Sequence, residues 1–332
     1  MSLDDWEGFD EWGTTQTDAN SHGWNTTANA PSTPAGRFSG SAYRWPNNTN
    51  TTRVFPEAAT RQTIGFAFRT NNAAASHTML SMLEAGTEHA RLAYNGNGTF
   101  TVSRAGTALG TTANLGIAAN TWYYIELDYT CADSPNGAYE LRVDGVNVSS
   151  GSGLDTRNGG ASGTMDTLRV SQPNATATDW DDYYSASGST SFQGDCRVIT
   201  NVPTSDGTYT AWTPSTGTNH YAVVDEIPYN GDTDYISTAG AGNRDTFGFP
   251  ALGVTGTVLG VQVQAIARKD DAGVRNLALV IDSNGTLSDG SSQALSASYT
   301  SYRRTDLQDP GAGPGAWTVT AVNAAQYGVK NV

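Results

Sequence analysis

The sequence of 332 residues predicts an all-β protein made of two β-sandwich domains, residues 1–190 and 191–332. Short segments of alternating apolar and polar residues recur along the chain, and Asn-Gly, Asp-Gly and other glycine-containing turns separate them. The length exceeds the usual size of one domain. The 8 Trp, 15 Tyr and 9 Phe are spread over the whole sequence, which favours a folded chain over a disordered one.

Eight segments of the first half alternate in the way that half-buried strands do. They span residues 37–45, 63–70, 78–85, 89–95, 99–106, 121–130, 138–148 and 164–172. Two successive Asn-Gly pairs in "YNGNGTF" (94–100) predict a tight hairpin, and Asp144-Gly145 predicts another, because both pairs suit two-residue turns. The short spacing of strands and turns is typical of a β-sandwich.

The composition turns small and polar over residues 183–195, "YYSASGSTSFQGD", which predicts a linker between the domains. Further short strands bounded by turn residues predict the second sandwich, and the clearest lie within 196–214, 220–228, 258–270, 275–283 and 294–306. Near the C-terminus we expect one helical turn capped by Thr320, followed by a last strand over 327–332.

The charge balance is strongly acidic, with a net charge of −14 at pH 7. Such a surface repels nucleic acid and anionic membranes, and we expect neither as a partner. The sequence has no run of about 18 apolar residues that would span a bilayer. Because the start, "MSLDDWEGFDEWG", lacks the layout of a signal peptide, we expect the protein either to stay in the cytoplasm of its producing cell or to leave by a route that needs no signal, such as lysis.

The segment "NTWYYIELDYT" (120–130) places two carboxylates on one face of a predicted strand. Trp122, Tyr124, Glu126 and Asp128 share this face, and the alternate residues are expected in the core. A retaining glycanase strand carries three alternating acids, with the nucleophile and the acid about 5 Å apart. The third position here is Thr130, so we interpret Glu126 and Asp128 as a solvated face and predict a non-enzymatic protein.

Two further acidic clusters in the first half contain aromatic residues, "DDWEGFDEW" (4–12) and "WDDYY" (180–184). Aromatic faces stack on sugar rings and carboxylates bind hydroxyls, so these clusters are candidates for glycan binding. The favoured interpretation is structural: the first and last strands pair, with Phe9, Trp12, Trp180 and Tyr183 in the core. The candidate residues for a glycan site or an interface are Trp122, Tyr124, Glu126, Asp128, Trp180, Asp181 and Asp182.

The second half offers candidate assembly residues. Asp225, Glu226, Asp232 and Asp234 either gather a cation or line a solvated loop that orients a neighbouring subunit, and the second interpretation is favoured. Arg303 and Arg304 are expected to pair with carboxylates of an adjacent copy, as weak surface ion pairs.

The cysteines and histidines fit no catalytic or metal-binding motif. The sequence leaves open whether Cys131 and Cys196 form a disulfide or remain thiols. His22 is expected in a polar loop, and the four histidines are not expected to form a site.

The run "NTWYYIELDY" followed by "NGAYELRVDGVNV" resembles the laminin-G and concanavalin A-like sandwiches, in which an aromatic strand precedes a hairpin with a V-D-G turn. The resemblance covers most of residues 1–190 and implies a jelly roll. Many members bind glycans, often with calcium at the rim of the sandwich. This sequence has no contiguous calcium loop, so calcium as a cofactor would require ligands from separate loops.

The junction resembles structural proteins of tailed bacteriophages. In those proteins a laminin-G-like domain ends on a W/F-D-D-x-Y strand and a G-D-x-R-V strand opens a second β-domain, as "WDDYY" and "GDCRV" do here. "NHYAVVDE", "DTDYI" and the terminal "AWTVTAVNAAQYGVK" extend the likeness over nearly the whole chain.

This resemblance implies a virion component carried on the tail or its fibres. The second domain would dock into the particle among other virion proteins, and the first would bind a host surface polysaccharide. Virion parts are built on symmetry axes, so we expect a homo-oligomer. The alternatives are a capsid decoration protein and a polysaccharide depolymerase whose two carboxyls, about 6.5–9.5 Å apart, come from distant loops.

Overall fold

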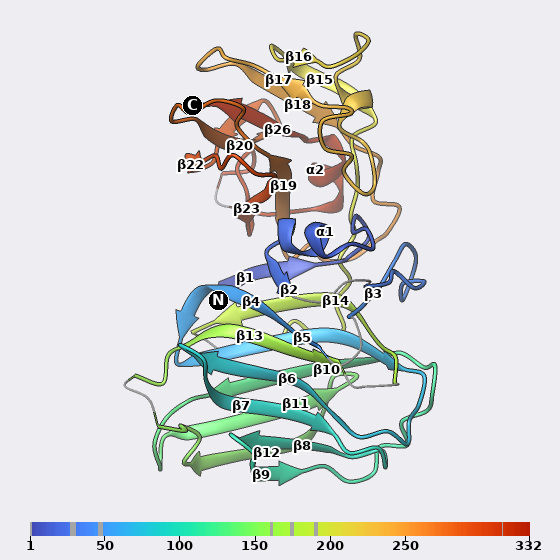
Figure 1. Cartoon of the computed structure of the whole chain (residues 1–332), viewed down its shortest axis with the longest axis vertical. Helices are drawn as coiled ribbons and strands as arrows, with labels where there is room; N and C mark the ends of the chain where they lie inside the picture. The colour runs from blue at the N-terminus through green and yellow to red at the C-terminus, as the bar shows by residue number, and fades with distance from the viewer. Residues whose placement is uncertain are drawn as a thin grey trace. The chain divides into compact units, whose positions relative to one another are not determined.

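The computed structural model describes residues 2–26, 31–45, 49–159, 162–172, 176–188, 192–313 and 315–332. The prediction of an all-β fold is confirmed: nearly all regular structure is strand (Figure 1). The helical segments of the described ranges are α1 (Gln16–Ser21), the 3₁₀ turn η1 (Tyr221–Val223) and α2 (Val319–Ala324). Of these, none is long and apolar enough to cross a membrane. The chain forms two compact units, Met1–Val198 and Ile199–Val332.

Sheet A of the first unit is antiparallel and has the strand order β1–β14–β5–β10–β11–β12, with β3 also paired to β14. The first and last strands of the unit pair side by side, as the sequence predicted, because β1 lies against β14. The strands are β1 (Ser2–Glu7), β3 (Tyr43–Arg44), β5 (Arg61–Thr70), β10 (Tyr123–Thr130), β11 (Gly137–Val143), β12 (Val146–Leu154) and β14 (Thr178–Ser187).

Sheet B has the order β2–β4–β13–β6–β7–β8–β9. Its strands are β2 (Trp24–Thr26), β4 (Thr49–Ala59), β6 (His77–Glu84), β7 (Thr87–Tyr94), β8 (Phe100–Arg104), β9 (Thr107–Thr111) and β13 (Met165–Gln172). The sequence missed β4 because it contains Pro56, which argues against a strand. The structure accommodates this proline at a register shift, where β4 residues 55–58 have no partner on β13.

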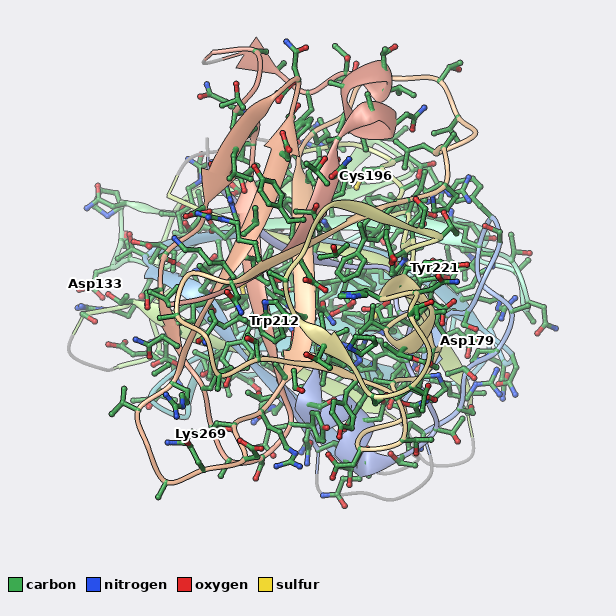
Figure 2. The ribbon with its side chains drawn as sticks, turned by 90° about the horizontal axis from the view of Figure 1, so that it is seen from above. Asp133, Asp179, Cys196, Trp212, Tyr221 and Lys269 are labelled. Atoms are coloured by element: carbon green, nitrogen blue, oxygen red, sulfur yellow. The ribbon has the colours of Figure 1, made fainter. Side chains whose placement is uncertain are left out.

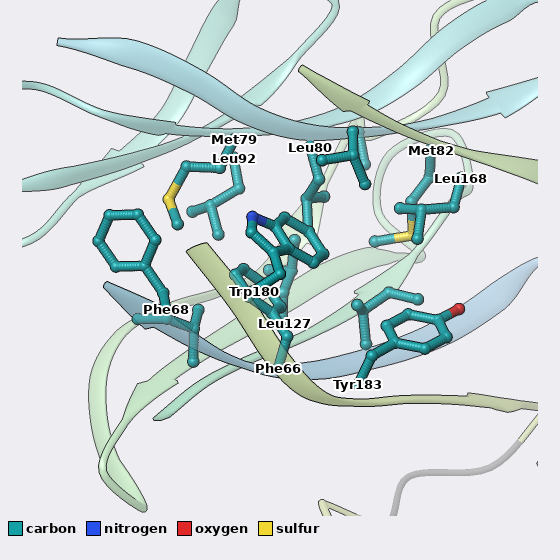
Figure 3. Close-up of a cluster of buried hydrophobic side chains, with 14 of the residues drawn as sticks. Phe66, Phe68, Met79, Leu80, Met82, Leu92, Leu127, Leu168, Trp180 and Tyr183 are labelled. Carbon is teal, nitrogen blue, oxygen red and sulfur yellow. The ribbon is translucent and has the colours of Figure 1, made fainter. Parts of the chain in front are cut away.

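The core of the first unit lies between sheets A and B and is rich in aromatic side chains (Figure 3). Phe66 of β5 stacks on Trp180 of β14, with ring centroids 3.8 Å apart. The expected core residues of the two acidic segments, Phe9, Trp12, Trp180 and Tyr183, are all buried, which confirms the structural interpretation of those segments.

Both predicted hairpins of the first unit form. β7 and β8 are joined through the Asn-Gly pairs, and β11 and β12 meet at Asp144-Gly145. Asp144 has φ +50° and Gly145 has φ +78°, the two positive angles that a type I′ turn requires. The expected strand over 37–45 is shorter than predicted: Tyr43–Arg44 forms a strand paired with β14, and Ser41 makes an isolated bridge to Ala35.

The second unit contains a six-stranded sheet, β15–β18–β26–β20–β21 with β22 also on β20, and a two-stranded sheet of β19 and β23. Leu277, Leu279, Ile281, Tyr302 and Tyr327 from these sheets share one hydrophobic core. The strands of the unit are β15 (Ser205–Thr210), β16 (Thr213–Pro214), β17 (Ile236–Ser237), β18 (Arg244–Gly248), β19 (Val261–Ala267), β20 (Asn276–Ser283), β21 (Thr286–Asp289), β22 (Gln293–Ala294), β23 (Thr300–Asp306), β24 (Gln308–Asp309), β25 (Gly315–Ala316) and β26 (Gln326–Asn331).

Two local predictions for the second unit are corrected. The segment 220–228 forms η1 and irregular backbone rather than a strand. The C-terminal helical turn is present, but its cap is Thr318, whose hydroxyl accepts from the Ala321 N–H at 3.1 Å, and Thr320 lies inside the helix.

Candidate functional site

The side of sheet A that faces away from the core, here called the outer face, carries the candidate residues of β10. The register places Glu126 opposite Gly65 of β5, and Gly65 opposite Tyr184 of β14. Tyr124, Glu126 and Asp128 are at most 4% exposed. The interpretation of Glu126 and Asp128 as a solvated face is therefore wrong, because other parts of the chain cover the strand on both sides.

Residues 192–198, here called the strap, lie on the outer face. The backbone N–H groups of Gln193 and Gly194 donate to the Tyr184 hydroxyl (3.1 Å) and to Glu126 Oε1 (2.9 Å). The Val198 N–H donates to Asp182 Oδ1 at 2.8 Å. Figure 2 labels Cys196 of the strap, whose sulfur lies 2.9 Å from the Tyr124 hydroxyl.

Much of the predicted linker, residues 183–195, belongs to the first unit instead. Residues 183–187 belong to β14, and residues 192–198 are bonded to sheet A. The compact first unit consequently extends to Val198, beyond the boundary expected at 190.

The centre of the outer face is a buried carboxylate held by a tyrosine. The Tyr184 hydroxyl donates to Glu126 Oε1 at 2.5 Å, and burial raises the pKa of Glu126. Gly65 makes room for this tyrosine, because a Cβ at that position would lie 2.0 Å from Tyr184 Cε1. Burial also raises the pKa of Tyr184, so its hydroxyl keeps its proton and acts as the donor.

A bulge in β14 places Asp181 and Asp182 side by side under the strap. The pairing with β5 shifts between Asp181 and Tyr184, and Asp182 has φ +49°. Burial raises the pKa of both carboxyls, and the charge of Asp182 adds to the effect on Asp181. Arg37 lies 3.6 Å from Asp182 and pairs at 2.5 Å with Asp195 of the strap.

One end of the outer face combines an aromatic ring with two arginines. Buried Asp179 of β14 accepts from Arg44 Nε at 2.6 Å and from Arg69 Nη2 at 2.7 Å. The Arg69 guanidinium lies over the Trp122 ring, 4.4 Å from its centroid. Trp122, Arg44 and Arg69 are partly exposed, and two cations face one anion. These four residues are called the Trp122 cluster below.

At the opposite end of the outer face, Asp128 accepts hydrogen bonds from side chains of the same unit. Arg61 Nη2 donates to Asp128 Oδ2 at 2.7 Å, and the Thr63 hydroxyl donates to Oδ1 at 2.9 Å. Glu126 and Asp128 are thus both buried and bonded within the unit. This strand does not present them as a pair to a polymer.

The candidate assembly residues of the second unit divide into Asp232, which has its own partners, and Asp225, Glu226 and Asp234, whose charges interact. Asp232 accepts from Arg268 at 2.8 Å and from the Tyr299 hydroxyl at 2.7 Å, whereas Asp234 accepts from Asn230. Burial raises the pKa of Glu226, with the charge of Asp225 contributing.

Arg303 and Arg304, the other candidate assembly residues, differ in their hydrogen-bond partners. Arg304 is bonded inside its own chain, to Asp306 at 2.6 Å and to the Leu279 carbonyl at 3.1 Å. Arg303 donates from Nε to the Ser301 hydroxyl at 3.2 Å.

Cys131 and Cys196 are free thiols, so the disulfide alternative is not realised. Cys131 is buried in the core of the first unit. Burial raises the pKa of each thiol to about 12, which keeps both protonated and unreactive at neutral pH.

Among the described residues, one group of three metal-capable side chains has its ligand atoms within 4.8 Å of one another: Glu7, Glu11 and His22. The expectation that His22 sits in a polar loop is wrong, because its side chain is buried at the end of α1.

Sequence reasoning missed Arg37, Arg44, Arg69, Asp179 and Tyr184. One signal was available for Arg69. In "RQTIGFAFRT" it lies six positions after Thr63, so the period of a strand puts both residues on the face that Asp128 shares. The partners Arg37 and Arg44 come from irregular chain and a two-residue strand, which carry no periodic signal.

Neither the family models nor the curated proteins compared with the chain match it. Solved structures match little more than half of the chain, with low TM-scores. An endo-β-1,4-glucuronan lyase from Trichoderma reesei has a TM-score of 0.40 and 13% identity, covering 56% of this chain and 96% of the lyase. Alginate lyase Aly36B has a TM-score of 0.38 and 10% identity (56% and 98% covered). The carbohydrate-binding module CBM66 from Bacillus subtilis has a TM-score of 0.32 and 12% identity (51% and 98% covered).

At these TM-scores the similarity carries no conclusion about a ligand or a reaction. It does correct one expectation. The sequence predicted a non-enzymatic chain, but the similar structures include two lyases as well as a binding module. The exclusion of catalysis is therefore withdrawn.

Proposed function

We propose that the chain is a structural component of a tailed-phage virion, carried on the tail or its fibres, whose first unit binds a glycan of the host surface. The observation that supports glycan binding is the Trp122 cluster. It offers a partly exposed aromatic ring beside two guanidinium groups that Asp179 holds in place. A sugar ring stacks on an aromatic face while fixed polar groups bind its hydroxyls or carboxylate.

The cluster suits recognition because its polar groups are already ordered. Arg44 and Arg69 share one buried carboxylate, so little side-chain freedom is lost when a ligand binds. The strap covers the centre of the outer face, whereas the Trp122 ring at this end stays partly exposed.

The test is a glycan array of neutral and acidic bacterial surface polysaccharides probed with the full chain, followed by titration of the best ligand. We expect Trp122→Ala to weaken binding about tenfold, equivalent to ~1.4 kcal/mol. The matched control is Val54→Ala, an exposed residue of sheet B, which should bind like the parent. Equal affinity of Trp122→Ala and the parent would show that the Trp122 cluster does not bind the glycan.

Incubation of the full chain with the best polysaccharide ligand also tests the depolymerase alternative. Polysaccharide chain length, measured before and after incubation, should stay constant if the site only binds. Progressive shortening would make degradation the better proposal.

The virion role rests on the resemblance at the junction between the two units. Quantitative mass spectrometry of purified particles tests it. A few to a few dozen copies per particle are expected for a tail or fibre component. Hundreds of copies would favour the capsid decoration alternative, and absence from particles would contradict the virion role.

A further inference from the structure

The stretch from the end of β1 to the end of α1 gathers four titratable side chains. Glu7 ends β1, Glu11 follows in the next turn, Asp18 lies in α1 and His22 caps that helix at its C-terminal end. The spacing of Asp18 and His22 is four residues, which puts both on one face of the helix.

The ligand atoms of Glu7, Glu11 and His22 lie within 4.8 Å of one another. Glu11 Oε1 is 3.7 Å from His22 Nδ1, too far for a hydrogen bond. Donors bound to one ion at about 2 Å each lie about 3–4 Å apart, so a small contraction would suffice to coordinate an ion. Glu7 and His22 are at most 3% exposed.

Asp18 gives an independent indication. Its Oδ2 accepts from the Gly13 N–H, while its Oδ1 has no hydrogen-bond partner although the residue is 4% exposed. This oxygen faces the imidazole, 4.0 Å from Nε2. A buried carboxylate oxygen without a partner is costly.

The surroundings hold the imidazole in one orientation. Trp12 stacks on His22 with ring centroids 4.8 Å apart and an interplanar angle of 21°. Glu11 lies on the Nδ1 side of the ring and Asp18 on the Nε2 side. A metal-bound histidine often has a carboxylate at its other nitrogen as well, and here Asp18 Oδ1 would have to move closer than 4.0 Å to accept from Nε2.

We propose that Glu7, Glu11 and His22 Nδ1 bind a divalent transition-metal ion, and that Asp18 is a positioning residue that accepts the Nε2–H of His22. An imidazole together with carboxylates suits Zn²⁺ or Mn²⁺, whereas Ca²⁺ takes oxygen ligands. The ion would tie the turn after β1 to α1 and so stabilise the start of the first unit.

The test uses the full chain, freed of metal by chelation and titrated calorimetrically with Zn²⁺, Mn²⁺ and Ca²⁺ in separate experiments. We expect one site per chain for Zn²⁺ or Mn²⁺ and a higher melting temperature of the loaded protein. Asp18→Asn should weaken binding about 10–100-fold, as loss of a carboxylate behind a metal-bound histidine does. Glu11→Gln, which removes a ligand at the most exposed position of the group, should weaken it at least as much.

The matched control is Glu57→Gln, an exposed glutamate of β4, which should leave the affinity unchanged. Near-UV circular dichroism verifies that each variant folds, and Asp18→Asn decides the matter if Glu11→Gln does not fold. The proposal is overturned if neither Zn²⁺ nor Mn²⁺ binds, if Ca²⁺ alone binds, or if the variants bind like the parent, which would indicate adventitious binding at the acidic surface.

Discussion

At the scale of single residues, two buried tyrosines of sheet A differ in whether their hydroxyl group makes hydrogen bonds. The Tyr184 hydroxyl donates to Glu126 and accepts from the strap, whereas the Tyr43 hydroxyl is buried without a hydrogen-bond partner. Deleting a donor to a buried carboxylate costs free energy, but deleting an unpartnered hydroxyl does not.

We expect Tyr184→Phe to lower the free energy of unfolding of the first unit by about 1–3 kcal/mol. Tyr43→Phe should be neutral or stabilising and serves as the matched control, because both rings are at most 1% exposed. Urea unfolding, combined with amide hydrogen exchange in β10, measures the difference. Equal stability of the two variants would show that the bond to Glu126 contributes nothing.

At the scale of elements, the bulge in β14 makes the first unit sensitive to pH. Asp181 and Asp182 have pKa values raised above the ordinary 3.8 by burial. The folded state therefore binds protons more tightly than the unfolded state, and stability falls as the pH rises above 3.8 through the folded pKa values. The lowered pKa of Glu84 acts in the other direction, but its contribution is lost only below about 4.5. Burial lowers the pKa of His77 to about 4, so this histidine makes stability rise up to about pH 6.5 and offsets part of the fall.

We expect the melting temperature of the first unit to fall between about pH 5 and about pH 8. Asp182→Asn removes one of the two charges, keeps the oxygen that accepts from Val198, and suits the positive φ of this position. Its melting temperature should fall less over the same range, by a difference on the order of 1 kcal/mol in stability. Calorimetry at both pH values checks this, and parallel curves for variant and parent would contradict it.

The elements also show where sequence reasoning succeeds. Ile125, Leu127 and Tyr129 alternate, so β10 and its core face were predictable from period alone. The burial of the opposite face could not be predicted, because Glu126 is covered by Gly194, 68 positions away in the sequence. Similarly, His22 is buried by partners that a turn and a short helix supply, and neither has a strong periodic pattern.

At the scale of the whole molecule, each unit has its own hydrophobic core, and the strap belongs to the first. We therefore expect the fragments 1–198 and 199–332 to fold separately. A fragment 1–190 lacks the backbone donors of the strap to Glu126, Tyr184 and Asp182, so each of these buried groups would lose one hydrogen bond.

The fragment 1–190 should melt at least about 5 °C below 1–198. Thermal unfolding followed by circular dichroism measures both, and the fragment 1–198 with Gln193→Ala is the control, because its strap keeps every backbone donor. Identical melting of the two lengths would mean that the strap lies on the outer face without stabilising it.

The strap has a mechanical consequence. It is the stretch of chain that leads out of the first unit, so tension applied through Ile199 reaches Val198 before any strand of sheet A. Such a pull would detach the bonds of Val198, Gly194 and Gln193 one after another, and β14 would carry load only after the last of them had opened. A chain that is stretched in use would thus yield first at a segment whose release leaves both cores folded.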